Sequence, residues 1–329
     1  MYALLYSKVF KRLYRLVRKK SKQRQSVYPP SDTMDHTSNS TISYEENEDF
    51  SLIEGRKYHK IENSPYSLPL DSKESDRMTM QHFILKQLFG NFMAPIKARL
   101  QEGIKVLDVG CSSGAWTMDM ASEYPNSEFV GVDMLPIFPN SIKPPNCTFV
   151  QNNILDGLDF EDNTFDFIFQ RATILAYPSD KTQDVYKELF RVLKPGGFIE
   201  LAEPMFDLFE CGPNSTHLLK QFYKVMESKN IDTSILDNLG PNLKSLGLIH
   251  IAENKRIGPC GATSELGAAG AEDVLLLIRA AKPSLLKVMQ VSDEEFEDLF
   301  SKAQQELLSE DYPNGHGKWV FAYGQKPAN

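Results

Sequence analysis

The stretch VLDVGCSSGAWT contains the residues best placed for ligand chemistry, which are Asp108, Gly110 and Gly114 in the pattern D-x-G-x-x-x-G. An apolar run that breaks into Gly and Ser and then resumes with helical spacing predicts a strand, a tight turn and a helix. The first N–H groups of a helix have no partner within it and form the positive end of its dipole. We therefore expect the loop from Gly110 to Gly114 to receive an anionic group, with the two glycines allowing the backbone to approach the ligand closely.

Asp108 helps to choose between classes of ligand. Sites that bind the pyrophosphate of a dinucleotide commonly have the pattern G-x-G-x-x-G, and the middle glycine is missing here. A carboxylate two residues before Gly110 would also repel phosphates, whereas it would attract an ammonium group. A nicotinamide-dependent dehydrogenase is therefore disfavoured.

Five short apolar runs predict the sheet that carries this loop. They are continuous rather than alternating, which is typical of strands covered on both faces. The runs are KVLDVG (105–110), EFVGVD (128–133), CTFVQN (147–152), FDFIFQ (165–170) and GFIELAE (197–203). Helical stretches separate some of them, and this rhythm predicts an α/β fold with a parallel, doubly wound sheet.

By composition the chain divides into a tail and one domain. Residues 1–50 are basic and then polar, with too few large apolar groups to offset the entropy of ordering them, so we expect a disordered tail. Residues 51–329 form the expected domain, with helices at 72–100 and a cofactor-binding core at 104–204. A helical insertion at 258–316 is interpreted as a lid that shapes the substrate site, with an oligomer contact or plain scaffold as the alternative.

VLDVGCSSG resembles motif I of the class I S-adenosylmethionine-dependent methyltransferases. Three later stretches resemble further motifs of that family in the expected order, namely VGVDM (130–134), FVQNNILDGLDFEDNTFDFIF (149–169) and RVLKPGGFIELAEP (191–204). Residues 55–82 more faintly resemble the N-terminal region of fungal methyltransferases associated with secondary-metabolism regulators. The resemblance implies S-adenosylmethionine as the cofactor, no metal, and a Rossmann-like methyltransferase sheet, mostly parallel with an antiparallel last strand.

The resemblance also implies which residues hold the methionine moiety of the cofactor. The loop from Gly110 to Gly114, including Cys111 and Ser112, would hold it, with Asp108 near its amino group. Independently of the resemblance, we hypothesise that Arg77, in the upstream segment, closes over the cofactor and pairs with its carboxylate.

The nucleoside end of the cofactor is assigned in the same way. Asp133 would accept both ribose hydroxyls, since one carboxylate can take two O–H donors. Met134 and the Ile154 N–H group would bracket the adenine ring. Asn153 stands where the family commonly has Asp, and its amide oxygen can accept the same hydrogen bond from adenine.

Gln170 and Arg171 follow the fourth strand, at the edge of the sheet where ligands bind in such folds. We expect them to line the pocket in which the methyl group is transferred. No general base stands out: His217, Glu203 and His82 are candidates, and a structural role is the alternative for each. Since a sulfonium already activates the methyl group, alignment with the acceptor is the main requirement, and a base helps only a poor nucleophile.

Charge and cysteine content limit the partners. The first 25 residues contain nine Lys or Arg and no acid, which leaves 27 basic and 44 acidic residues in the remainder. Such an acidic body does not suit nucleic acid. Four dispersed cysteines without CxxC spacing favour a reduced compartment, and we expect a cytoplasmic protein, with mitochondrial or nuclear placement as alternatives. Residues 1–20 are basic and amphipathic, so they could contact a membrane surface.

Two functions follow from these observations. The first is a methyltransferase acting on a small-molecule acceptor, or on a protein side chain. The second is a regulatory or scaffold protein that binds the cofactor and transfers little or no methyl.

Overall fold

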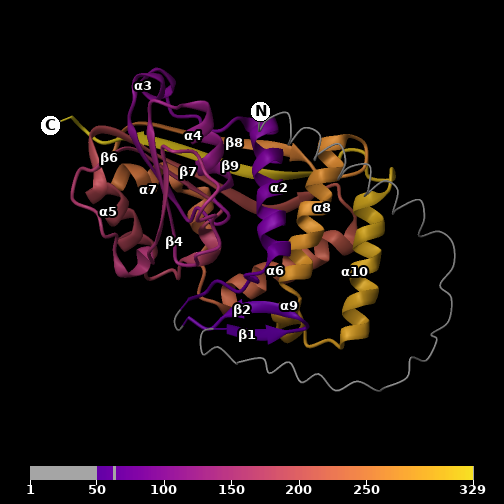
Figure 1. Cartoon of the computed structure of the whole chain (residues 1–329). Helices are drawn as coiled ribbons and strands as arrows, with labels where there is room; N and C mark the ends of the chain where they lie inside the picture. The colour runs from indigo at the N-terminus through magenta and orange to yellow at the C-terminus, as the bar shows by residue number, and fades with distance from the viewer. Residues whose placement is uncertain (1–49, 62–63, 329) are drawn as a thin grey trace. The chain divides into compact units, whose positions relative to one another are not determined.

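The computed structural model describes residues 50–61 and 64–328, so the expected tail, including its basic segment, lies outside the described residues apart from Phe50. The chain divides into two units, and all described residues belong to the second, Asp49–Asn329. At its centre lies a seven-stranded sheet flanked by helices (Figure 1). In the described part of the chain, no helix is both long and apolar enough to cross a bilayer.

The sheet has the order β5-β4-β3-β6-β7-β9-β8. Its strands are β3 (Lys105–Val109), β4 (Glu128–Asp133), β5 (Cys147–Gln151), β6 (Phe165–Arg171), β7 (Leu193–Phe209), β8 (Ile249–Pro259) and β9 (His316–Gln325). The first five pair in parallel, and β9 is antiparallel to both of its neighbours. The predicted doubly wound sheet with an antiparallel last strand is therefore confirmed.

Both faces of the sheet are buried, which explains the continuous apolar runs. Val106 of β3 packs in one hydrophobic cluster, whereas its neighbour Leu107 packs in the other. Because side chains alternate along a strand, each strand needs apolar residues on both faces. Asp108 is the fully buried charged residue of β3, at 4% exposed, and it lies where the strand reaches the carboxyl edge of the sheet.

Helices cover the two faces. They are α3 (Lys97–Glu102) and α4 (Ala115–Glu123) on one face, and α5 (Thr182–Val192), α6 (Pro213–Ser228) and α7 (Leu239–Ser245) on the other. Short 3-10 turns follow β5 and β6, at η1 (Ile154–Asp156) and η2 (Ile174–Ala176), and a third, η3 (Thr233–Asp237), lies between α6 and α7. The turns η1 and η2 lie beyond the carboxyl ends of β5 and β6, where they help to form the pocket described below.

The insertion between β8 and β9 contains three helices, α8 (Glu265–Ala280), α9 (Lys282–Met289) and α10 (Asp293–Leu308). The N-terminal helix α2 (Ser72–Phe89) packs against α8, and α10 packs against α8 and α6 (Figure 1). The hairpin of β1 (Phe50–Ile53) and β2 (Arg56–His59) precedes α2. The N-terminal helix α2 and the insertion between β8 and β9 are thus in contact with each other beside the sheet.

Arg77 joins α2 to α8 through a buried ion-pair network. Its Nε and Nη2 donate to Glu74 Oε1 at 2.9 and 2.6 Å, and its Nη1 donates to Asp273 Oδ1 at 2.8 Å. Arg77 is 5% exposed and Glu74 is 2% exposed. Burial alone would lower the pKa of Arg77, but the two carboxylates raise it above its ordinary value. The guanidinium is therefore a structural clamp.

Replacing Arg77 should destabilise the fold strongly. We expect Arg77→Met to lower the free energy of unfolding by about 3 to 5 kcal/mol, because the buried Glu74 loses its cation. The matched control is Lys302→Met, which removes an exposed i,i+4 ion pair with Asp298 and should change that free energy by less than about 0.5 kcal/mol. Urea unfolding measures both, and equal effects would contradict the clamp.

Candidate functional site

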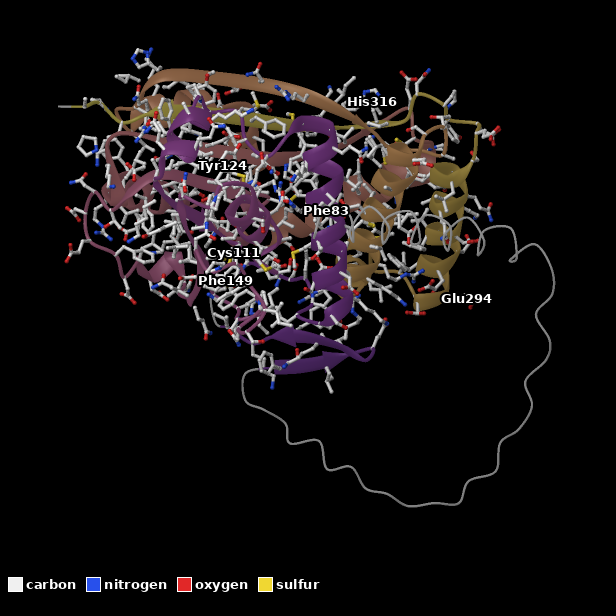
Figure 2. The ribbon with its side chains drawn as sticks, turned by 45° about the horizontal axis from the view of Figure 1, so that its top comes forward. Phe83, Cys111, Tyr124, Phe149, Glu294 and His316 are labelled. Carbon is white, nitrogen blue, oxygen red and sulfur yellow. The ribbon has the colours of Figure 1, made fainter. Side chains whose placement is uncertain are left out.

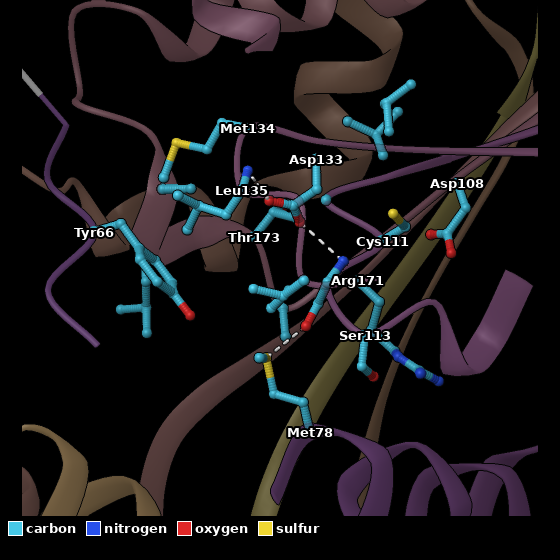
Figure 3. A pocket seen from close by; sticks show the side chains of 18 of the residues that line it. Tyr66, Met78, Asp108, Cys111, Ser113, Asp133, Met134, Leu135, Arg171 and Thr173 are labelled. Carbon is cyan, nitrogen blue, oxygen red and sulfur yellow. Dashed lines mark hydrogen bonds between the residues drawn. The ribbon is translucent and has the colours of Figure 1, made fainter. Parts of the chain in front are cut away.

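A pocket of about 150 Å³ opens at the carboxyl ends of β3, β4 and β6. Its wall is completed by α2, by the turns η1 and η2, and by Leu277 of α8. In Figure 3, Met134, Leu135 and Tyr66 lie on one side of Asp133, and Asp108 and Arg171 lie on the other. This is the edge at which ligands bind in parallel sheets, where the strand order reverses.

The loop between β3 and α4 is organised by hydrogen bonds to β4. The N–H groups of Gly110 and Cys111 donate to Val132 O at 2.9 and 3.0 Å, and Ser112 N donates to Asp133 Oδ2 at 2.8 Å. These donors already have protein acceptors. These three N–H groups therefore fix the path of the chain, whereas the expected binding of an anion by the first N–H groups of the helix concerns the start of α4 and stays a prediction.

Both glycines of the loop are required by its packing. Gly110 and Gly114 have φ angles of +70° and +72°, in the left-handed region that favours glycine. A Cβ on Gly110 would lie 2.6 Å from Thr173 Cγ2, and one on Gly114 would collide with the ring of Phe149. Figure 2 shows Phe149 beside Cys111 of the loop. Contacts with Thr173 and Phe149, and not only the need to leave space for a ligand, therefore exclude larger residues at these two positions.

The carboxylate of Asp133 holds two loops and faces the pocket. Its Oδ2 accepts from Ser112 N, and its Oδ1 accepts from Leu135 N at 2.9 Å. Each oxygen keeps a further lone pair, and the side chain is only half-buried. Burial raises the pKa of Asp133 to about 6, although the two N–H donors act to lower it. A vicinal diol could donate to both oxygens at once.

Asp108 supplies a second carboxylate on the opposite side of the loop. Its Oδ2 accepts from Thr117 Oγ1 of α4 at 2.5 Å. Burial raises the pKa of Asp108 to about 7, while Thr117 and the nearby Arg171 act to lower it. A cation bound at this end of the pocket would favour the ionised carboxylate and would recover part of the cost of burying it.

His82 of α2 and Arg171 at the end of β6 meet at the same end of the pocket. Arg171 Nη2 lies 3.0 Å from His82 Nδ1, and since arginine can only donate, Nδ1 is the unprotonated nitrogen. Burial lowers the pKa of His82 to about 4, although Asp119 acts to raise it. A neutral imidazole whose lone pair is already engaged is unsuited to act as a general base, so this candidate role is corrected.

Comparison with known proteins decides the family. A family model described as a methyltransferase domain matches residues 106–197. The chain is 30% identical over 198 residues to the methyltransferase str2 of Strobilurus tenacellus, covering 58% of this chain and 70% of that protein. The chain belongs to the S-adenosylmethionine-dependent methyltransferases.

Two further likenesses are more partial. This methyltransferase is 31% identical over 215 residues to the secondary metabolism regulator laeA of Aspergillus niger, and it spans only 50% of that protein's length while 59% of this chain is covered. It also resembles the solved structure of Haemonchus contortus phosphoethanolamine N-methyltransferase 2 in complex with S-adenosyl-L-methionine, at 18% identity and a TM-score of 0.46, with 82% of this chain and 62% of that chain covered.

The pocket of this methyltransferase fits the cofactor. Asp133 offers two oxygens to a ribose diol, and Asp108 offers a buried carboxylate to the ammonium of a methionine moiety. Other residues expected to hold the cofactor also line the pocket, namely Gly110, Cys111, Ser112, Met134, Asn153, Ile154 and Arg77. Asn153 also accepts from Leu155 N at 3.2 Å, so it caps η1 as well as facing the pocket.

Two expected cofactor residues do not line the pocket. Gly114 lies behind the loop, against Phe149. Gln170 is 2% exposed, and its Oε1 accepts from Tyr177 Oη at 3.1 Å. Because alternate residues along β6 face opposite sides of the sheet, Arg171 reaches the pocket and Gln170 does not. Arg77 does line the pocket, but its guanidinium is occupied by Glu74 and Asp273.

Two of the candidate bases are also misplaced. Glu203 accepts from Thr173 N at 3.1 Å and from Ile174 N at 3.2 Å, which holds the turn after β6, and burial raises its pKa to about 7. His217 is exposed on α6, where its ring contacts Gln221. Neither lines the pocket, so both have structural or surface positions rather than the expected catalytic one.

Sequence analysis missed several apolar residues of the wall, among them Leu175, Phe206 and Leu277. Such residues cannot be distinguished from ordinary core residues in a single sequence. Leu277 belongs to α8, so the insertion contributes to the pocket wall, and its role as a substrate-shaping element stays a prediction.

Asp108 should make cofactor binding depend on pH. Between pH 8 and pH 6, the affinity for S-adenosylhomocysteine relative to 5′-methylthioadenosine, which lacks the amino acid group, should fall about tenfold. The reason is that the ammonium favours ionised Asp108, whose pKa of about 7 in the free protein means that the favourable form is lost as the pH falls. Asp133 contacts the part that both ligands share, so its titration cancels in the ratio.

Isothermal calorimetry measures the two affinities. Asp108→Asn is the control, since it should lower the ratio at pH 8 and make it independent of pH. A constant ratio in the unmodified protein would contradict the placement of Asp108 beside the ammonium.

Proposed function

We propose that this protein transfers the methyl group of S-adenosylmethionine to a small-molecule acceptor by in-line displacement. The observation that carries the proposal is the pair of carboxylates, Asp108 and Asp133, at the ends of neighbouring strands and facing one pocket. Their placement on neighbouring strand ends suits a ligand that carries an ammonium group and a ribose diol. Family membership supports the same cofactor.

The apolar wall supports a role in aligning an acceptor. When bound, S-adenosylmethionine supplies a methyl group on a sulfonium leaving group. Leu68, Leu175, Phe206 and Leu277 contribute apolar surface to the pocket and would exclude water from the reacting atoms. Alignment of two reactants in a dry site can account for about 7 to 11 kcal/mol of a barrier.

The titratable residues of the pocket wall favour an acceptor that needs no base. His82 is neutral and engaged with Arg171. Burial raises the pKa of the Cys111 thiol and of the Tyr66 hydroxyl above their ordinary values, so both stay protonated at neutral pH. Apart from Asp108 and Asp133, which this proposal assigns to the cofactor, none of the described residues that line the pocket is therefore a ready proton acceptor for a neutral hydroxyl. An acceptor atom that is already nucleophilic at neutral pH, such as a carboxylate, phenolate or thiolate, fits this wall best.

A second candidate function is a regulatory protein that binds the cofactor and transfers methyl slowly or not at all. It is favoured by the name of the relative from Aspergillus niger, a secondary metabolism regulator, of which this chain spans half. The two functions differ in whether S-adenosylhomocysteine accumulates during incubation with an acceptor.

Asp133 provides the sharpest test of cofactor use. Asp133→Ala should lower the affinity for S-adenosylhomocysteine and for 5′-methylthioadenosine alike, by about 30-fold or more, because both lose charge-assisted hydrogen bonds to the ribose. The unmodified full-length chain, incubated with methyl-labelled S-adenosylmethionine and a small-molecule extract, should form labelled product and S-adenosylhomocysteine in equal amounts.

Asp184→Ala is the matched control, since this carboxylate is 63% exposed on α5 and lies outside the pocket wall. It should bind and turn over as the unmodified protein does. Tight cofactor binding without labelled product in any extract would favour the regulatory function, and absence of cofactor binding would exclude both.

A further inference from the structure

Arg171 presents a guanidinium to the pocket with most of its donors unused. It lines the wall at the end of β6 and donates one hydrogen bond, to His82 Nδ1. Its plane lies near the ring of Phe169, 5.7 Å from the centroid. No carboxylate lies within ion-pair distance of it among the described residues. Burial lowers the pKa of Arg171 only to about 10, so it is a cation at neutral pH.

Several other donors nearby are already occupied. Arg77, the other arginine of the pocket wall, is held by Glu74 and Asp273. The N–H groups of Gly110, Cys111 and Ser112 donate to β4, as described above. Of the described residues around the pocket, Arg171 is thus the cation that keeps free N–H groups for an anionic ligand.

The position of Arg171 indicates which anion it meets. Asp108 and Arg171 belong to neighbouring parallel strands, with Asp108 paired to Phe169, and they act electrostatically on each other. Figure 3 places both at the end of the pocket opposite Met134 and Tyr66. A carboxylate and a guanidinium side by side match the two charges of an α-amino acid, which has an ammonium and a carboxylate on one carbon.

We propose that Arg171 binds the α-carboxylate of the cofactor's methionine moiety, beside Asp108, and that His82 is a positioning residue that orients the guanidinium. The proposal rests on the proposed function, since it assumes the cofactor lies in this pocket. It moves to Arg171 the role that the sequence suggested for Arg77.

His82 can orient Arg171 because its ring is buried, at 1% exposed, and lies against a carboxylate on the other side. Its Nε2, which carries the proton, lies 3.3 Å from Asp119 Oδ2 of α4, an electrostatic contact without hydrogen-bond geometry. Asp119 is fixed by Lys86 at 2.6 Å and by Asn91 at 3.0 Å. A line of contacts therefore runs from α4 through α2 to the end of β6. A guanidinium held in this way loses less entropy when it meets a carboxylate.

The test compares two ligands on the full-length chain. Arg171→Gln should lower the affinity for S-adenosylhomocysteine about 100-fold, because a buried charge-assisted pair is lost. The affinity for 5′-methylthioadenosine, which has the same adenosyl group but no carboxylate, should change less than about threefold. Binding of the second ligand also shows that the variant is folded.

Arg256→Gln is the matched control. Arg256 likewise lies over a phenylalanine, 5.7 Å from the Phe321 centroid, and donates to one acceptor, Phe89 O, but it is on β8 and outside the pocket wall. Both affinities should be unchanged in this variant.

His82 is tested by the same ratio. His82→Ala should lower the affinity for S-adenosylhomocysteine about tenfold and spare 5′-methylthioadenosine, whereas a merely structural role would weaken both. His82→Asn, whose Oδ1 can accept from Arg171 in place of Nδ1, should restore most of the loss.

The outcomes separate this proposal from the proposed function. If the unmodified chain binds neither ligand, the proposed function fails and this proposal fails with it. If Arg171→Gln leaves both affinities unchanged, the carboxylate is held elsewhere, at the start of α4 for example, and the proposal alone is overturned. Equal weakening of both ligands, or a change confined to the KM of the acceptor, would also overturn it.

Discussion

The carboxylate of Asp133 is the interaction on which the site depends. It accepts N–H groups from Ser112 and Leu135, one from each of the loops that leave β3 and β4. The two loops form neighbouring parts of the pocket wall, so this one carboxylate sets the distance between them. The same two hydrogen bonds fix the orientation of the carboxylate, and so the direction of the lone pair that each oxygen keeps free. A group that organises the protein is therefore also the group best placed to receive a ligand, and it needs no rearrangement to do so.

This arrangement has a cost in stability. Burial raises the pKa of Asp108 to about 7, of Asp133 to about 6 and of Glu203 to about 7, which means that the ionised forms are destabilised in the free protein. Glu203 recovers part of this cost through three hydrogen bonds to the turn after β6. Asp108 has one, from Thr117. The carboxylate that is least satisfied by the protein is thus the one that gains most from a cationic ligand.

The sequence predicted the parallel core well, because burial on both faces leaves continuous apolar runs such as FDFIFQ. It also predicted Asp108 and Asp133, since strand ends and glycine spacing are local features. It misassigned Arg77 because the partner that occupies it, Asp273, lies 196 residues away in α8. The prediction for Gln170 was wrong for a different reason. Side chains alternate along a strand, so Gln170 and Arg171 lie on opposite faces of the sheet, and the sequence does not say which face opens onto the pocket. The walls formed by Phe206 and Leu277 depend on tertiary packing alone.

The insertion connects stability to specificity. Asp273 and Leu277 lie four residues apart on α8, on the same side of the helix, so the ion pair that holds Asp273 against α2 also holds Leu277 at the pocket. Gln81 of α2 adds a second hydrogen bond to Asp273, at 2.8 Å. The N-terminal helix and the insertion, which are far apart in the chain, therefore form one rigid wall over the carboxyl edge of the sheet. The carboxylates of the pocket, Asp108 and Asp133, belong to strand ends, whereas α8 contributes apolar surface through Leu277, so apolar side chains of this wall can change without altering the two carboxylates.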